Sequence, residues 1–290
     1  MECRACPFEC GVDRTQELGV CRASDCVEVS TAQLHFWEEP PISGTRGSGT
    51  VFFSHCNLRC RFCQNYRISQ QGSGRPVTAG ELATMMLDLA GQGAHNVNLV
   101  SPTHYSEQLI PVLEQVRPRL GVPVVWNSNG YEKAATLRRL EGLVQVYLPD
   151  FKYWSGDLAA RCSSAPDYAR HASAAIAEMV RQTGPNRYAG DGTILSGVII
   201  RHLILPGHVD DTRQVLDAIA RIVGTDVPVS LMAQYYPVHR AAELAGMDRR
   251  LTAREYEAAC DHLAALGFAA GFTQDLSSAS SDYTPDFPGS

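Results

Sequence analysis

Three cysteines stand close together in the chain, at Cys56, Cys60 and Cys63, with the spacing C-x3-C-x2-C. A [4Fe–4S] cluster that only carries electrons is held by four thiolates. A loop with three thiolates leaves one iron free for a non-protein ligand, as a catalytic zinc ion keeps an open position. The spacing therefore predicts an iron–sulfur site that activates a cofactor.

Zinc, disulfides and chance spacing are the alternative interpretations of this loop. A structural zinc site usually pairs two separate cysteine knuckles, and no second C-x2-C follows nearby to complete one. Ten cysteines among 290 residues is a low density for a disulfide scaffold, and the cysteines are clustered rather than spread along the chain. The pattern is short enough to arise by chance, so its sequence context must support the cluster.

The spacing, with an aromatic residue just before the third cysteine, resembles the signature of the radical S-adenosylmethionine (SAM) enzymes. The resemblance implies that the three cysteines are cluster ligands and catalytic residues, and that SAM chelates the open iron through its amino and carboxylate groups. One electron from the reduced cluster then cleaves SAM to methionine and a 5′-deoxyadenosyl radical, which takes hydrogen from a substrate. It also implies that Phe62 packs on adenine, with Gln64 and Asn65 beside it at the cofactor.

The elements that must position this loop follow the rhythm of a parallel sheet wrapped by helices. A β-branched and aromatic run at 50–54 delivers the loop from its carboxyl end, where α/β barrels place their chemistry. Capping boxes at Thr78 and Thr252 predict the starts of two helices. The predicted strands are 50–54, 96–100, 123–126, 144–148, 197–205 and 227–232, and the other predicted helices are 107–116, 132–140, 168–182 and 211–223.

The expected fold class is α/β, as a partial (β/α)6 TIM-like barrel of the radical SAM type with a small cysteine-rich N-terminal extension. With 44% of its 290 residues hydrophobic, the chain can bury one large core. The expected domains are the extension at 1–45 and the barrel at 46–276. The remaining stretch, 277–290, is rich in serine, proline and aspartate and predicts a disordered tail.

Charge and hydropathy indicate which kinds of partner and which cellular compartment to expect. A formal net charge of −6 argues against a protein that grips nucleic acid. The chain starts without a basic-then-apolar signal segment, and its most apolar stretch, 197–206, is interrupted by Arg201 and His202. We therefore expect a cytoplasmic protein with no membrane partner, in a compartment that keeps cysteines reduced.

Polar residues follow nearly every predicted strand, as a cofactor bound at the mouth of a barrel would require. In the radical SAM family the segment after the second strand holds the methionyl amino group, so the resemblance implies this role for Ser101, Thr103 and His104. A Ser/Thr helix cap is the alternative. Ser128 and Asn129 stand where the family reaches the SAM ribose, although Asn-Gly is also a common turn.

Three further residues resemble those of the activating enzymes for glycyl-radical proteins. Asp150 and Lys152 form an Asp-x-Lys segment, and the resemblance implies that both are catalytic residues near SAM and the substrate. Arg201 lies in an apolar strand and must pair with an anion, because a lone buried guanidinium is costly. The SAM carboxylate is one candidate partner, and structural pairing with Asp150 or Asp211 is the alternative.

A second cysteine group lies at the N-terminus and consists of Cys3, Cys6, Cys10 and Cys21, with Cys26 as a substitute. Four thiolates form a closed site, which suits structural zinc or an auxiliary [4Fe–4S] cluster, and spacing does not choose between them. Free structural thiols are the alternative.

The N-terminal pattern and the segment Glu38-Glu39-Pro40-Pro41-Ile42-Ser43-Gly44 resemble an uncharacterised branch of pyruvate formate-lyase activating enzyme homologues. The likeness runs from Cys3 to about Gly267. It implies a glycyl-radical-activase-like oxidoreductase that takes electrons from a reductant such as flavodoxin or ferredoxin and removes hydrogen from a glycine of a partner protein. Radical SAM modification of a small molecule or peptide is the first alternative, and a non-catalytic iron–sulfur protein for electron transfer or regulation is the second.

Overall fold

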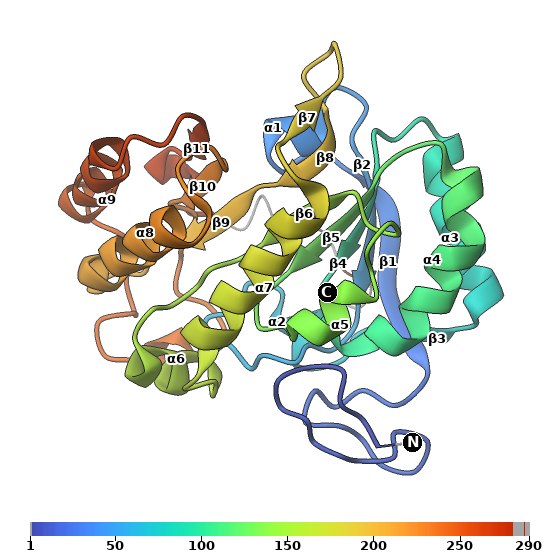
Figure 1. Ribbon diagram of the computed structural model, residues 1–290. Helices are drawn as coiled ribbons and strands as arrows, with labels where there is room; N and C mark the ends of the chain where they lie inside the picture. The colour runs from blue at the N-terminus through green and yellow to red at the C-terminus, as the bar shows by residue number, and fades with distance from the viewer. Residues whose placement is uncertain (1, 281–286, 288–290) are drawn as a thin grey trace.

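The computed structural model describes residues 2–280 and Phe287, and an eight-stranded sheet forms its centre (Figure 1). The strand order is β3-β1-β2-β4-β5-β6-β8-β7. The series β2, β4, β5, β6 and β8 is parallel, whereas β1, β3 and β7 pair with their neighbours in antiparallel fashion. The bounds are β1 Val27–His35, β2 Ser48–Phe53, β3 Arg75–Val77, β4 Val97–Val100, β5 Val124–Ser128, β6 Val146–Pro149, β7 Arg187–Tyr188 and β8 Ile194–Val198.

A second, three-stranded sheet continues the parallel series. It consists of β9 (Ile200–Leu203), β10 (Val229–Met232) and β11 (Gly271–Thr273), all parallel. Asp150, directly after β6, forms a parallel bridge with Arg201 of β9, which joins the two sheets. Among the described residues no pairing joins β11 to β1 or β3, so the barrel is incomplete. The expected α/β fold with a partial barrel is confirmed.

Helices cover the outer faces of the sheet, as the alternating sequence pattern predicts. The capping boxes at Thr78 and Thr252 are both present, because each threonine side chain accepts from the third helical amide and the glutamate there bonds back. The helices are α1 Pro40–Ser43, α2 Tyr66–Ser69, α3 Ala79–Gly91, α4 Ser106–Leu120, α5 Ala134–Arg138, α6 Gly156–Ser163, α7 Tyr168–Thr183, α8 Val209–Val223 and α9 Ala253–Ala265.

The two faces of the central strands carry different side chains. On β4, Val97 packs into the main hydrophobic core, whereas Asn98 points the other way and donates to Glu38 over 3.0 Å. On β5, Trp126 lies in the same core and Asn127 donates to Glu38 over 2.9 Å. Because side chains alternate along a strand, Val97 and Trp126 face the main core, whereas Asn98 and Asn127 face the barrel interior.

Two elements differ from the sequence-based prediction. The predicted strand 197–205 is two strands, β8 and β9, divided at Ile199 so that β8 pairs with β6 and β9 with β10. The predicted N-terminal extension contains β1, which pairs along most of its length with β2 and therefore belongs to the central sheet. The long stretch without helix or strand is 2–26, apart from a bridge between Glu2 and Asp13.

Described residues near both ends of the chain pack against the barrel. The N-terminal segment packs on α5, where Thr136 donates to the carbonyl of Ala5 over 2.9 Å (Figure 1). In the predicted tail, Leu276–Ser278 is a short 3-10 helix and Phe287 packs edge-on against Phe52. The rest of that tail, 281–286 and 288–290, lies outside the described residues.

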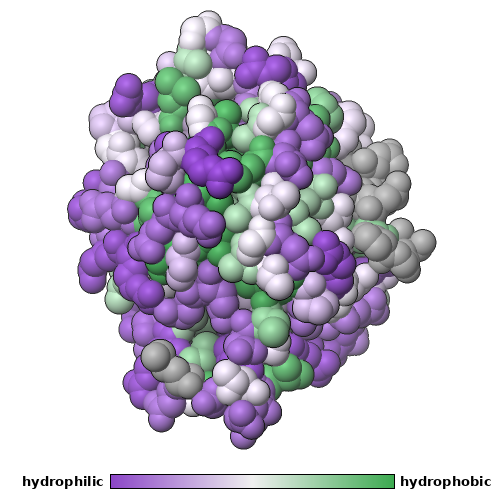
Figure 2. Space-filling model, turned by 90° about the vertical axis from the view of Figure 1, so that its right-hand side faces the viewer, coloured by the Kyte–Doolittle hydropathy of each residue, from purple (hydrophilic) through white to green (hydrophobic). Residues whose placement is uncertain are grey.

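The surface over α3 and α4, which faces the viewer in Figure 2, is predominantly hydrophilic, with apolar residues in narrow streaks between polar ones. Within the described part of the chain, no helix is both long and apolar enough to cross a membrane.

Candidate active site

The cysteine loop follows β2 and places its thiols against hydrogen-bond donors from other elements. Ser163, at the end of α6, donates to Sγ of Cys60 over 3.0 Å. Asn129, just after β5, donates to Sγ of Cys56 over 3.3 Å. Donors of this kind stabilise negative charge on sulfur, and hydrogen bonds to the sulfurs help to set the potential of an iron–sulfur cluster.

The third thiol has a partner on α2, where Sγ of Cys63 lies 3.2 Å from the hydroxyl of Ser69. Burial raises the pKa of Cys56 to about 12 and that of Cys63 to about 11. Both are therefore thiols when no metal is bound, and a metal must displace their protons.

All three cysteines line one cavity of about 140 Å³, here called the inner cavity. Its walls also include Ser101, Ser128 and Asn129, three residues predicted to bind the cofactor. Among the described residues, no three His, Cys, Asp or Glu side chains surround a single point as the ligands of one ion do. The three thiols instead line a shared space, and an iron–sulfur cube needs its thiolates on different irons. The donor set therefore fits a cube with one open iron.

A neighbouring middle cavity of about 210 Å³ shares Cys60, Cys63 and Asn65 with the inner one. It is also lined by Phe62 and Gln64. Asp150, Lys152 and Arg201 line both cavities, so the structure brings these predicted residues together beside the cysteines.

Phe62 is held in place by aromatic neighbours. Its ring centroid lies 5.8 Å from that of Tyr235 and 6.4 Å from that of Tyr153. Gln64 donates to the backbone carbonyl of Gln234 over 2.8 Å, which ties the end of the cysteine loop to the segment after β10. The loop is thus fixed from the opposite side of the barrel.

A charged network crosses the floor of both cavities. Lys152 contacts Asp150 at 2.6 Å, and Arg201 contacts Asp150 at 3.0 Å and Glu38 at 3.2 Å. Burial would raise the pKa of Asp150, but the two cations beside it hold that pKa below its ordinary value. Burial raises the pKa of Glu38, and Arg201 only partly opposes it. Asp150 is therefore ionised between two cations.

Arg201 has the structural partner that the sequence left as an alternative. Its guanidinium pairs with Asp150, whereas Asp211 accepts the backbone amides of Trp154 and Ser155, at 3.2 and 2.7 Å. Arg201 also contacts Asn127, at 2.5 Å. Because it lines both cavities as well, it can still face a bound anion.

Thr103 and His104 are not among the residues that line the inner or middle cavity. Thr103 donates to Glu132 over 3.0 Å, and Nε2 of His104 donates to the carbonyl of Ser54 over 2.9 Å. His104 is buried, and this burial lowers its pKa to about 3. In this structure the two side chains brace neighbouring strand ends.

Sequence reasoning missed Glu132 and Glu38. Glu132 is 3% exposed and accepts from Trp126 at 2.8 Å, Ser128 at 2.7 Å and Thr103. Glu38 stands in the Glu-Glu-Pro-Pro segment and was noted only for its family likeness. No local pattern marks either residue as part of the site, because Glu38 and Glu132 each have a partner far away in the chain.

The N-terminal cysteines gather in one loop segment. Cys6 and Cys21 are buried, and burial raises the pKa of Cys6 to about 12. A side chain on Gly19 would meet Sγ of Cys21 at 3.2 Å and Sγ of Cys10 at 3.7 Å, so these two sulfurs approach the same point. Cys3 contacts Cys10, and Cys26 is exposed.

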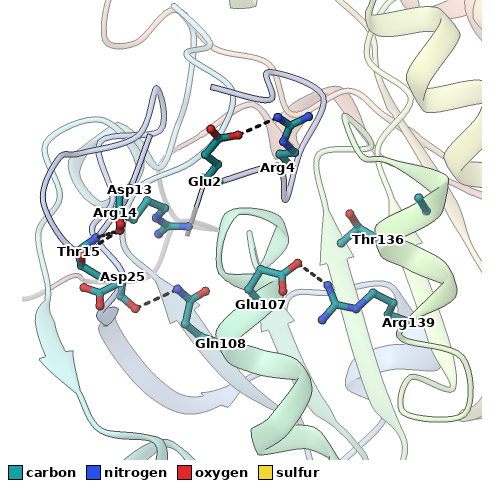
Figure 3. A pocket seen from close by; sticks show the side chains of 12 residues that line it. Glu2, Arg4, Asp13, Arg14, Thr15, Asp25, Glu107, Gln108, Thr136 and Arg139 are labelled. Carbon is teal, nitrogen blue, oxygen red and sulfur yellow. Dashed lines mark hydrogen bonds and ion pairs between the residues drawn. The ribbon is translucent and has the colours of Figure 1, made fainter. Parts of the chain in front are cut away.

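A larger cavity of about 770 Å³ lies between this segment and helices α4 and α5 (Figure 3). An ion pair between Glu107 and Arg139 joins the two helices at 2.5 Å across one side of it. Arg14 lines it and reaches the backbone of His104 and Ser24. None of Cys56, Cys60 and Cys63 lines this space.

Comparison with known proteins agrees with this arrangement. A family model described as a 4Fe–4S single cluster domain matches residues 43–147, which include the cysteine loop. An uncharacterised protein of Methanocaldococcus jannaschii is 32% identical over 269 residues, which covers 89% of this chain and 73% of the relative.

Solved structures share the fold. The crystal structure of Streptococcus suis SuiB bound to SAM matches with a TM-score of 0.51 and 14% identity, over 77% of this chain and 49% of that one. SuiB bound to its precursor peptide SuiA matches with the same TM-score and identity, over 77% and 48%. The chain thus spans about half the length of SuiB. The chain therefore belongs to one family with the Methanocaldococcus protein, shares the fold of SuiB, and is similar over residues 43–147 to the 4Fe–4S single cluster domain.

Proposed function

We propose that Cys56, Cys60 and Cys63 hold a [4Fe–4S] cluster with one open iron and that the protein uses it to cleave SAM reductively. When bound, the cluster supplies one electron and SAM supplies the 5′-deoxyadenosyl radical that takes hydrogen from the substrate. One observation carries the proposal: the two contiguous cavities are lined by every residue predicted for this chemistry except Thr103 and His104.

The protein's own contribution is to orient the cofactors and exclude water. Asn129, Ser163 and Ser69 are proposed to steady the three thiolates through the hydrogen bonds already described. Phe62 is proposed to pack on adenine, since its aromatic neighbours fix the ring at the wall of the middle cavity.

The remaining lining residues are proposed to bind SAM. Ser101, Ser128 and Asn129 offer polar groups at the inner cavity, and Gln64 and Asn65 do so at the middle one. Thr103 and His104 are proposed to support this site through the strand ends rather than through the cofactor.

Asp150, Lys152 and Arg201 are proposed to bind at the boundary between SAM and substrate. Lys152 and Arg201 present positive charge to both cavities, although each is partly neutralised by Asp150. Such a pair can receive a carboxylate without leaving it unpaired in a buried site.

The N-terminal cysteines are proposed to form a second, closed metal site of zinc or an auxiliary iron–sulfur cluster. Among the described residues no three of these thiols surround a single point, so they would have to move together to bind one zinc ion. The proposal is supported by the four thiols in one segment and by the approach of Cys10 and Cys21 toward Gly19. Cys26 is exposed, which makes it the weaker candidate ligand.

The substrate is proposed to be one of two kinds. A glycine of a glycyl-radical partner protein, with flavodoxin or ferredoxin as the reductant, follows from the family likeness. A small molecule or peptide is the second kind, and it is favoured by a further cavity of about 400 Å³ that shares Glu38 and Arg201 with the middle cavity.

Anaerobic reconstitution with iron and sulfide, followed by reduction in the presence of SAM, tests the proposal. We expect 5′-deoxyadenosine from the wild type and from Cys260→Ala, a control at a partly buried cysteine of α9. Cys60→Ala should lose both the cluster and the product. A stable wild-type cluster that never cleaves SAM would instead indicate an electron carrier.

A further inference from the structure

A third cavity of about 400 Å³, here called the outer cavity, adjoins the middle one and shares Glu38, Arg201 and Gln234 with it. It opens along β10 and β11 and is also lined by Glu39. No cysteine lines the outer cavity. A group chelated to a cluster iron therefore belongs to the inner and middle cavities, and the outer cavity remains for another ligand.

The charges that line the three cavities do not balance. The carboxylates are Glu38, Glu39 and Asp150, and the cations are Lys152 and Arg201. His35 also lines the middle cavity, and burial lowers its pKa, so it adds no positive charge near neutral pH. Of these three carboxyl groups, two form ion pairs with Lys152 or Arg201 in the described part of the chain, and the third does not.

The carboxyl group without an ion pair to a described residue is that of Glu39. Burial raises its pKa, and the charge of Arg201 only partly opposes this, so a cationic ligand would favour its ionised form. Lys152 pairs with Asp150, and Arg201 pairs with Asp150 and Glu38. Oε2 of Glu39 is buried and has no hydrogen-bond partner among the described residues, while the hydroxyl of Ser230 bonds the carboxylate. A buried carboxylate oxygen without a donor is costly, so this atom is suited to a donor that arrives with a ligand.

We propose that Glu39, with Glu38 beside it, binds a primary ammonium group on an alkyl chain of the substrate. This inference rests on the proposed function and names the substrate class of that site. An ammonium fits better than a guanidinium, because a guanidinium fork pairs best with two free carboxylate oxygens and Glu39 offers one. Apolar lining from Met232 and Phe272 suits the alkyl chain.

The side-chain amides of Gln234 and Gln274, which line the outer cavity, are hydrogen-bonded to each other. Gln274 donates to Oε1 of Gln234 over 2.9 Å and accepts from the amide of Ala233 over 3.1 Å. This pair fixes the wall of the outer cavity, so specificity for the cation falls to the carboxylates.

Binding of defined amines to the anaerobically reconstituted protein tests the proposal without any turnover. The probes are n-pentylamine and its uncharged counterpart 1-pentanol, followed by free lysine and Nα-acetyl-lysine-methylamide, with saturation-transfer NMR as the readout. We expect pentylamine to bind at least tenfold more tightly than pentanol. A preference for the blocked lysine over free lysine would indicate a peptide side chain, and the reverse a small molecule.

Glu39→Gln keeps the shape and removes the charge, and it should weaken pentylamine binding at least tenfold. Glu114→Gln, at an exposed glutamate of α4, is the matched control and should bind like the wild type. Thermal melting of each variant separates loss of the site from loss of the fold. Equal binding by Glu39→Gln, equal binding of pentanol, or no binding by the wild type would overturn the proposal.

Failure of the proposed function has a different result. If the wild type binds pentylamine through Glu39 but yields no 5′-deoxyadenosine from SAM, the amine site stands and radical chemistry falls. If SAM is cleaved but no amine binds, the radical chemistry stands and the amine site is wrong.

Discussion

The sulfurs of the cysteine loop receive hydrogen bonds from side chains outside the loop, and this has a measurable electronic consequence. Ser163 donates to Sγ of Cys60, and such a donor favours the reduced, more negative state of a bound cluster. Ser163→Ala should therefore lower the reduction potential by roughly 50 mV, equivalent to about 1 kcal/mol for one electron. An EPR-monitored redox titration measures this shift, with Ser173→Ala on α7 as control. An unchanged potential would mean that the serine does not reach the cluster.

Glu132 is a single residue that accepts hydrogen bonds from three side chains, two on β5 and one in the segment after β4. Glu132→Ala would leave donors of Thr103, Trp126 and Ser128 without their acceptor, and buried donors without partners are costly. We expect a loss of about 3–5 kcal/mol in the free energy of unfolding. Urea denaturation followed by tryptophan fluorescence measures it, and the exposed Glu114→Ala should change stability by less than about 0.5 kcal/mol.

His104 predicts how stability depends on pH. Burial lowers its pKa from 6.5 to about 3, so below pH 6.5 the unfolded chain binds a proton that the folded chain does not. The contribution is fully present above pH 6.5 and is lost progressively as the pH falls toward 3. His104→Gln should flatten the slope of unfolding free energy between pH 6.5 and 5 by up to about 1.4 kcal/mol per pH unit. Parallel profiles for the two proteins would contradict this burial effect.

At the scale of elements, the N-terminal segment is held to α5 by few contacts, among them Thr136 to Ala5 and Lys133 to Glu9. If its four cysteines bind metal, much of its order comes from that metal. Cys6→Ser and Cys21→Ser should each lower the iron or zinc content per chain, whereas Cys26→Ser, at an exposed cysteine, should not. Metal analysis of the four proteins decides this. Equal metal content throughout would favour free thiols.

Helices and strands could be predicted where residues close together in the sequence determine where an element begins or ends. Thr78 and Thr252 start helices because a capping box satisfies orphan amides within four residues. β1 was missed because its residues stand next to a cysteine-rich loop and pair with a strand that runs the other way. The break at Ile199 was missed because it depends on which neighbour each half of the strand finds.

The candidate site was predictable to a similar extent. The cysteine spacing, the polar strand ends and the family resemblance named half of the residues that line the inner and middle cavities. The partners Glu38, Glu132 and Ser163 come from distant parts of the chain, and no local pattern marks them. The sequence also could not predict that the side chains of Thr103 and His104 do not line the inner or middle cavity, because their orientation depends on which strand ends are neighbours in the fold.

At the scale of the whole molecule, a bound cluster would tie the cysteine loop to α2, α6 and the end of β5. Binding only to the folded chain stabilises it by about 3 kcal/mol at a hundredfold excess over the dissociation constant. Removal of iron by oxidation and chelation should therefore lower Tm by on the order of 5–10 °C. Scanning calorimetry measures the shift, and Cys60→Ala should show none under the same treatment. An unchanged wild-type Tm would mean that the loop is held without iron.

The bridge between Asp150 and Arg201 links the two sheets mechanically as well as electrostatically. These residues join the two sheets through their backbones, where the amide of Phe151 donates to the carbonyl of Arg201 at 2.7 Å, and their side chains form the ion pair in the barrel. The backbone link between the two sheets and the ion pair inside the barrel are thus formed by the same two residues. A ligand that contacts these side chains would therefore also act on the backbone bridge between the sheets. We expect the barrel wall to be more rigid when a ligand is bound. Hydrogen exchange at the Phe151 amide should then be slower with a ligand bound in the barrel than without one.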